Sequence, residues 1–185
     1  MSLQEIYTSG KIPWQRKKTN LSGWLEKAEV FSGDVLDLGC GTGEIAIWLA
    51  KNNFFVEAID LSREAIKIAN NYDAPNVSFS VWNLEELSKY PFKKKKYDLV
   101  VDSKTLRFIQ DKEAYFSIIA PKLKGVFIVQ TFLKHKEKPF LVIEKDYLEG
   151  LILNYFKLKE KSFYPFPTKQ NPDIVMAEYF LVPKK

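Results

Sequence analysis

The chain has 185 residues, of which 46% are hydrophobic and 28% are charged, and its formal net charge is +5 at pH 7. This length suits one domain with a substantial core, and because no run of about 18 apolar residues exists, we expect no membrane span. The basic residues are nearly all lysines, since only Arg16, Arg63 and Arg107 are arginines, and phosphate and base recognition favour arginine, so a nucleic-acid partner is not expected.

The first 20 residues are polar and irregular, with Tyr7, Pro13 and Trp14 standing out. They contain no apolar signal region, and the single cysteine, Cys40, leaves no disulfide and no cysteine cluster for a metal. We therefore expect a cytoplasmic protein without a metal. The expected organisation is a single domain over residues 1–185, with an N-terminal arm over 1–20 and a core over 21–185.

Strand and helix patterns alternate along the core. The expected strands are 35–38, 54–59, 76–81, 97–101, 125–132, 156–163 and 174–182. The expected helices are 21–29, 44–51, one capped by Ser62, one capped by Asp111 and stopped by Pro121, and 144–154. This alternation predicts a doubly wound α/β fold with a mostly parallel sheet and helices on both faces. No helix separates the last two strands, so they should form a hairpin that places one antiparallel strand in the sheet.

The run Asp37-Leu38-Gly39-Cys40-Gly41-Thr42-Gly43 lies between the first strand and its helix. Glycines allow positive φ and close approach of a ligand, and a helix start offers free N–H groups. One interpretation is dinucleotide binding, because Gly41-x-Gly43-x-x-Ala46 fits a loose G-x-G-x-x-A pattern with Asp60 further on. The other interpretation treats Asp37, Gly39, Gly41 and Gly43 as one motif.

That second motif resembles motif I of the class I S-adenosylmethionine (SAM)-dependent methyltransferases. The acid is physically reasonable, because SAM carries an ammonium and a sulfonium where NAD carries a diphosphate. The resemblance covers roughly residues 20–182, and it implies a seven-stranded sheet whose last strand is antiparallel. It also implies that Asp37, Gly39, Cys40, Gly41 and Gly43 bind the cofactor.

Further cofactor residues are expected at the next two strand ends. Asp60 ends the second strand, where a carboxylate can accept hydrogen bonds from both ribose hydroxyls, and Leu61 would pack on the adenine. Asn83 and Leu84 follow the third strand. Families with this motif commonly have an Asp at the place of Asn83 that binds the adenine amino group, and an Asn carbonyl can accept the same bond. Trp82 either flanks the adenine or fills the core.

Asp102 and Ser103 end the fourth strand, beside the sulfonium in this fold, and are candidates to line the methyl-transfer site. The Asn/Asp-Pro-Pro-aromatic run of many amine-methylating enzymes is absent here, and Cys40 lies in the wrong loop for a cytosine-methylating nucleophile. His135, the single histidine, is a candidate base after the fifth strand. Arg107 either anchors an anionic acceptor or is a solvated helix residue.

The pair Pro13-Trp14 is similar to the lead segment of thiol, thiopurine and tellurite-type methyltransferases, which folds over the cofactor as a lid. The chain has Gln15 where those families have Asp. Trp14 is therefore assigned to the cofactor site, with a simple tether between the N-terminus and the core as the alternative.

The expected function is SAM-dependent methyl transfer to a small molecule, with a thiol or another soft nucleophile as candidate acceptor. The alternatives are an RNA or protein methyltransferase, a non-catalytic SAM-binding regulatory protein, and an NAD-dependent oxidoreductase. The lysine run 93–96 begins the fourth strand, far from the expected site, so it should not take part in catalysis. A monomer or a homodimer is expected.

Overall fold

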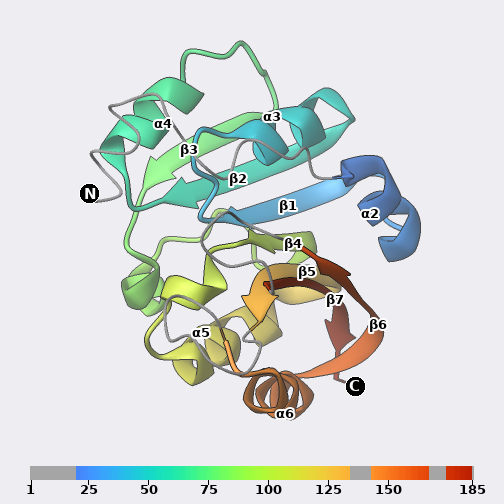
Figure 1. The fold of residues 1–185 in the computed structure, drawn as a ribbon. Coiled ribbons are helices and arrows are strands. Elements are labelled where there is room, and N and C mark those ends of the chain that lie inside the picture. The colour runs from blue at the N-terminus through green and yellow to red at the C-terminus, as the bar shows by residue number, and fades with distance from the viewer. Residues whose placement is uncertain (1–19, 134–142, 167–173, 185) are drawn as a thin grey trace.

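The computed structural model describes residues 20–133, 143–166 and 174–184. They form a seven-stranded sheet in the order β3-β2-β1-β4-β5-β7-β6 (Figure 1). The strands are β1 Gly33–Leu38, β2 Phe54–Asp60, β3 Val77–Val81, β4 Tyr97–Ser103, β5 Leu123–Leu133, β6 Phe156–Pro165 and β7 Val175–Pro183. Strands β1 to β5 pair in parallel, and β7 pairs antiparallel with both β5 and β6. This confirms the predicted sheet with its antiparallel C-terminal hairpin.

Helices cover both faces of the sheet. They are α2 Leu21–Ala28, α3 Glu44–Lys51, α4 Arg63–Ala69, α5 Lys112–Ile119 and α6 Lys145–Tyr155. Helices α2, α3 and α4 lie on one face, and α5 and α6 lie on the other (Figure 1). Each face buries its own apolar cluster, so the sheet is the middle layer of three. Ser62 and Asp111 cap α4 and α5 as predicted, accepting from Ala65 and Ala114 N–H at 3.2 and 2.8 Å.

Two central strands are longer than their apolar runs predict. β4 continues to Ser103 and β5 begins at Leu123, because backbone pairing between them extends past the apolar residues. In that added part, Ser103 lies opposite Gln130. Polar side chains of two strands therefore meet at the carboxyl edge of the sheet, where the glycine loop also lies.

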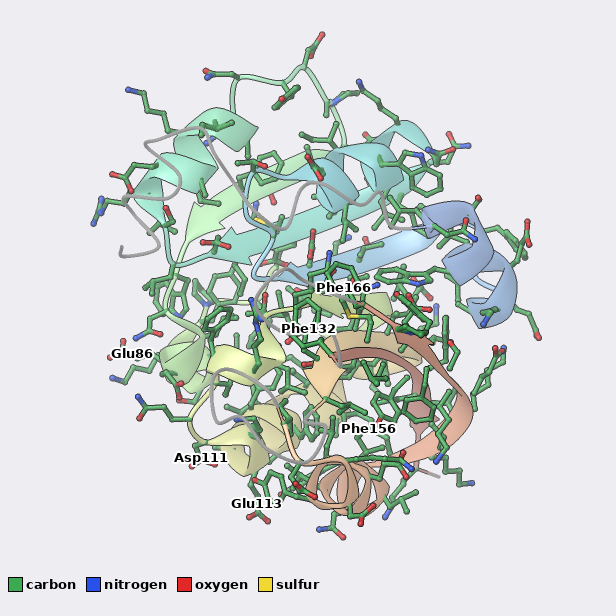
Figure 2. All side chains as sticks on the ribbon, viewed as in Figure 1. Glu86, Asp111, Glu113, Phe132, Phe156 and Phe166 are labelled. Atoms are coloured by element: carbon green, nitrogen blue, oxygen red, sulfur yellow. The ribbon has the colours of Figure 1, made fainter. Side chains whose placement is uncertain are left out.

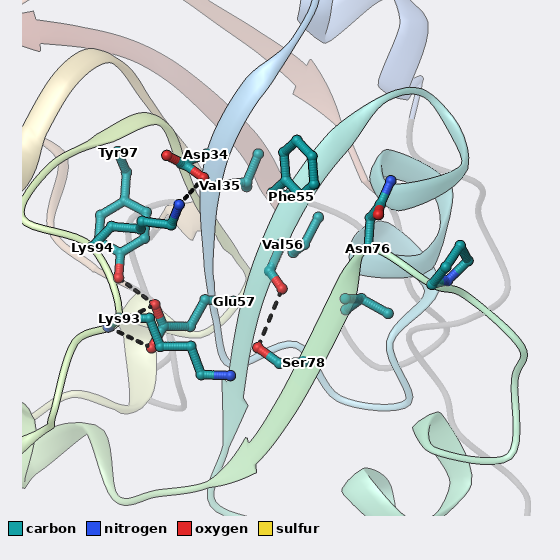
Figure 3. Close-up of a pocket in the computed structure, with 12 residues that line it drawn as sticks. Asp34, Val35, Phe55, Val56, Glu57, Asn76, Ser78, Lys93, Lys94 and Tyr97 are labelled. Atoms are coloured by element: carbon teal, nitrogen blue, oxygen red, sulfur yellow. Dashed lines mark hydrogen bonds and ion pairs between the residues drawn. The ribbon is translucent and has the colours of Figure 1, made fainter.

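The opposite edge carries a surface pocket of about 300 Å³ (Figure 3). Glu57 is buried there and accepts hydrogen bonds from the backbone N–H of Lys93, at 3.3 and 3.2 Å, and from the Tyr97 hydroxyl. Lys94 pairs with Asp34 at 3.0 Å. The first lysines of the run 93–96 thus lie beside the amino ends of the strands. None of the described helices is long and apolar enough to cross a membrane.

Candidate functional site

The glycine loop bends from the end of β1 towards β2. The backbone N–H groups of Gly39 and Cys40 donate to the Ile59 carbonyl at 2.8 and 3.0 Å. Gly39 has a φ of 77°, and a Cβ there would collide with the Thr105 side chain. Gly43, the N-cap of α3, has a φ of 82°. Only glycine takes up these conformations without strain, so local geometry explains both residues.

Asp37 is 1% exposed, and its Oδ2 atom has no hydrogen-bond partner. Burial, together with the charges of Asp102 and Asp60, raises the pKa of this carboxyl to about 8, although the Ala46 backbone N–H acts in the opposite direction. A buried carboxylate oxygen without a partner is costly. A ligand that brings a cation or a hydrogen-bond donor to Oδ2 would remove that cost.

Asp60 is held in a fixed orientation at the end of β2. Its Oδ2 accepts from the Gly41 N–H and its Oδ1 from the Ser62 N–H, both at 2.8 Å. Burial raises the pKa of Asp60, and these N–H groups oppose the shift. Each carboxylate oxygen has a second lone pair, so both can still accept a hydroxyl hydrogen.

Three acids, Asp37, Asp60 and Asp102, therefore gather at the carboxyl ends of β1, β2 and β4, and burial raises all three pKa values. Glu44 adds a fourth in the first turn of α3. A diphosphate would meet repulsion here, whereas a cationic ligand would be attracted. Burial and the Asp37 and Asp60 carboxylates also raise the pKa of the Cys40 thiol, which argues against a reactive thiolate.

The residues after β3 make contacts within the protein. Asn83 caps the short 3-10 helix Leu84–Lys89, accepting from the Glu85 N–H at 3.1 Å. The Leu84 side chain is buried in the core, and the assignment of this residue to the cofactor site remains a prediction. Trp82 packs on Tyr90 with ring centroids 5.3 Å apart. Leu61 is 59% exposed, and its contact with an adenine remains a prediction, as does that of Asn83.

Asp102 is fully buried, which corrects the expectation that it lines the transfer site. Its Oδ1 accepts from the N–H groups of Thr105 and Leu106 at 2.9 and 3.0 Å, and its Oδ2 accepts from the Tyr115 hydroxyl at 2.7 Å. Burial raises its pKa to about 6, and these hydrogen bonds oppose the shift. Asp102 therefore holds the turn after β4. Ser103, half-buried beside it, donates to the Gln130 Oε1 at 2.9 Å.

Sequence reasoning missed a polar row across the sheet. Ser103, Gln130, Glu178 and Ser162 lie opposite one another on β4, β5, β7 and β6. Gln130 Nε2 donates to Glu178 Oε1 at 2.9 Å and to the Tyr164 hydroxyl at 3.0 Å. The Tyr164 hydroxyl in turn donates to Glu178 Oε1 at 2.8 Å. The sequence feature that could have indicated this row is the presence of a glutamine, Gln130, and a glutamate, Glu178, within otherwise apolar strands.

Two predicted site residues, Trp14 and His135, lie outside the described residues. Within the described ranges, no group of three or more His, Cys, Asp or Glu side chains could hold a metal ion. The site is thus defined by the glycine loop, the acids around it, and the polar row beyond β4.

A model described as "Methyltransferase domain" matches residues 32–165 of the chain. The chain belongs to this methyltransferase family. The predicted resemblance to class I SAM-dependent methyltransferases is therefore confirmed, with the fold that it implies.

Relatives of this methyltransferase chain differ in their named activities. It is 28% identical over 152 residues to "Ubiquinone biosynthesis O-methyltransferase" of Rickettsia canadensis (strain McKiel), covering 76% of this chain and 63% of the relative. It is 38% identical over 101 residues to "Arginine-hydroxylase NDUFAF5, mitochondrial" of Homo sapiens, covering 52% of this chain and 28% of the relative. The first curated relatives are matched over 63%, 48% and 66% of their own length, so the chain spans roughly half to two thirds of them.

A solved structure has the same fold. It is a 1,6-didemethyltoxoflavin-N1-methyltransferase of Burkholderia thailandensis with bound S-adenosylhomocysteine, and it superposes with a TM-score of 0.76 at 18% identity. The superposition covers 97% of this chain and 85% of that protein. At this identity, the likeness concerns the fold.

Proposed function

We propose that this protein transfers a methyl group from SAM to a small-molecule acceptor. The observation that carries the proposal is the buried Asp37, whose Oδ2 has no partner and which lies directly before the three glycines. SAM supplies an electrophilic methyl group together with the ammonium that this carboxylate lacks.

The described residues fit SAM better than NAD. Asp37 would hold the ammonium, and Asp60, fixed by two backbone N–H groups, would accept from the ribose hydroxyls. The acids at the strand ends disfavour a diphosphate. The protein's contribution to the reaction is then to align the acceptor with the methyl group and to exclude water, and such orientation can supply roughly 7–11 kcal/mol of a barrier.

A thiol or another soft nucleophile is the proposed acceptor class, because such a group needs little help beyond ionisation. The methyltransferase relatives named for ubiquinone biosynthesis act, by their names, on oxygen. Hydroxyl acceptors therefore belong in the test beside thiols. We also propose a cytoplasmic protein that acts as a monomer or homodimer on small molecules, without nucleic acid.

The experiment is turnover with SAM and a panel of thiols, phenols and amines, measured as formation of S-adenosylhomocysteine. Asp37→Asn, which keeps the shape of the side chain and removes its charge, is the matched control. We expect product with at least one acceptor in the wild type and a strong loss in the variant. Binding of SAM without turnover of any acceptor would favour a regulatory protein or a different reaction, for which the hydroxylase relative is a precedent.

A further inference from the structure

Arg107 lies between two aromatic rings at the carboxyl edge of the sheet. It belongs to the 3-10 helix Leu106–Phe108 after β4. Its guanidinium carbon is 4.6 Å from the centre of the Phe108 ring and 4.7 Å from that of Phe132. Phe166 packs edge-on against Phe132 with centroids 5.2 Å apart, and Figure 2 shows these two rings side by side. The rings support the guanidinium, so its N–H edge is the part left for hydrogen bonding.

That edge has no anionic partner in the described part of the chain. No described carboxylate lies within ion-pair distance of Arg107, and its buried Nε lacks a hydrogen-bond acceptor. Burial lowers the pKa of the guanidinium to about 10. Five lysines elsewhere show the contrast, because each of them pairs with a carboxylate at 3.2 Å or less: Lys27, Lys94, Lys124, Lys159 and Lys161.

Lys104 adds a second cation nearby. Its φ of 71° is uncommon for a residue with a side chain, and its backbone N–H donates to the Gln130 carbonyl at 2.6 Å. Burial and the charge of Arg107 lower the pKa of its ammonium, whereas the charges of Glu44 and Glu178 act to raise it. The turn after β4 therefore carries two cationic residues, Lys104 and Arg107, three positions apart in the sequence.

These cations lie next to the glycine loop. Thr105, between them in sequence, covers Gly39 and places its Oγ1 3.4 Å from the Gly39 carbonyl. Phe132 follows Gln130 by two residues on β5, so both side chains point to the same face of the sheet. The site therefore has acids at the ends of β1 and β2, and cations and polar side chains beyond β4 and β5.

We propose that Arg107, assisted by Lys104, binds a carboxylate of the methyl acceptor. A planar guanidinium edge matches a carboxylate with two parallel hydrogen bonds, and the buried Nε–H is one donor of such a pair. This inference rests on the proposed function, because it names the substrate class of the same site. Under this proposal, Arg107 selects the acceptor, and SAM is bound by Asp37 and Asp60 at the ends of β1 and β2.

The test compares matched ligands in calorimetric titrations of the complex with S-adenosylhomocysteine. The probes are 3,4-dihydroxybenzoate and 3-mercaptopropionate, each beside its neutral analogue, 3,4-dihydroxybenzyl alcohol and 3-mercaptopropan-1-ol. The variants are Arg107→Met, which keeps an unbranched apolar stem between the rings, and Arg107→Lys, which keeps the charge without the planar edge. Lys122→Met is the control, because Lys122, the residue directly before β5, is also a cation over an aromatic ring, with its Nζ 3.9 Å from the centre of the Phe92 ring.

In the wild type, we expect at least one carboxylate to bind about ten-fold or more tightly than its neutral analogue. Arg107→Met should abolish that preference, Arg107→Lys should retain a small part of it, and the control should retain all of it. Affinity for S-adenosylhomocysteine should stay within about two-fold in every variant, because the acids hold that ligand.

Three results would overturn the inference. One is a wild type without carboxylate preference, and another is an Arg107→Met variant that keeps it. The third is loss of S-adenosylhomocysteine affinity in folded Arg107→Met, which would assign Arg107 to the amino-acid carboxylate of that ligand. Failure of the wild type to bind S-adenosylhomocysteine at all is a different outcome, because it refutes the proposed function itself.

Discussion

Replacing Asp37 by Asn should stabilise the protein without ligand and weaken its binding of SAM. In the structure, burial raises the pKa of Asp37 from 3.8 to about 8. At pH 7, the carboxyl is therefore ionised in the unfolded chain and mostly protonated in the folded one. Because the folded pKa is the higher one, the stability that the side chain contributes is complete below about pH 4 and is lost as the pH rises to about 8.

The size of that loss follows from the shift. The interval between the ordinary pKa of 3.8 and pH 7 is about 3 units, and each unit corresponds to about 1.36 kcal/mol. Asp37 therefore lowers the free energy of unfolding by about 4 kcal/mol at pH 7. An Asn avoids this loss but buries an amide group without a partner, which costs about 1–3 kcal/mol. We therefore expect Asp37→Asn to raise the free energy of unfolding by about 1–3 kcal/mol at pH 7 to 8. At pH 4, the gain should disappear or reverse.

Urea denaturation of wild type and variant at pH 4, 6, 7 and 8 measures the difference directly. Calorimetry should show SAM affinity about ten- to a hundred-fold lower in the variant, because a charge-assisted bond is lost. A variant that is less stable than the wild type at pH 8, or a stability difference that does not change with pH, would refute the description of Asp37 as an unpaired buried acid.

Three further predictions concern other parts of the fold. Asp60→Asn should weaken binding of S-adenosylhomocysteine by about ten-fold or more, and an unchanged ligand-induced shift in melting temperature would exclude the ribose role. Tyr115→Phe removes a hydrogen bond to buried Asp102 and should destabilise the protein by about 1–3 kcal/mol at pH 8, as measured by urea denaturation. The effect should be smaller at pH 4, because the raised pKa of about 6 leaves Asp102 protonated there, and an equal effect at both pH values would contradict this account. Replacing the lysines 93–96 by Gln should leave methyl transfer unchanged in a turnover assay, and a steep fall in activity would restore the nucleic-acid hypothesis.

Local chemistry made the fold predictable from the sequence. Apolar periodicity and three glycines predicted the strand–glycine–helix motif at Asp37. Ser62 and Asp111 cap helices because their side-chain oxygens accept hydrogen bonds from the free N–H groups of the first helical turn. The missing helix between the last two strands predicted the antiparallel hairpin. These features depend on neighbours in sequence, so a linear pattern contains them.

The acceptor side was not predictable in the same way. The roles of Gln130 and Glu178 depend on pairing between strands that are distant in sequence. Asp102 looked like a site residue because it ends an apolar strand, but Tyr115 and the turn after β4 enclose it. The two rings that support Arg107 belong to a short helix and to the end of a strand, and no local sequence pattern predicts that they contact the same side chain.

The most direct test of the central claim is calorimetric titration of SAM at pH 7 in two buffers with different ionisation enthalpies. We expect SAM to bind and NAD not to bind. Binding of SAM should release a proton, because the ligand's ammonium favours the ionised form of Asp37, whose pKa is about 8 without ligand. The proton release should be absent in Asp37→Asn. Micromolar binding of NAD with no heat from SAM, or SAM binding with no proton release, would contradict the account.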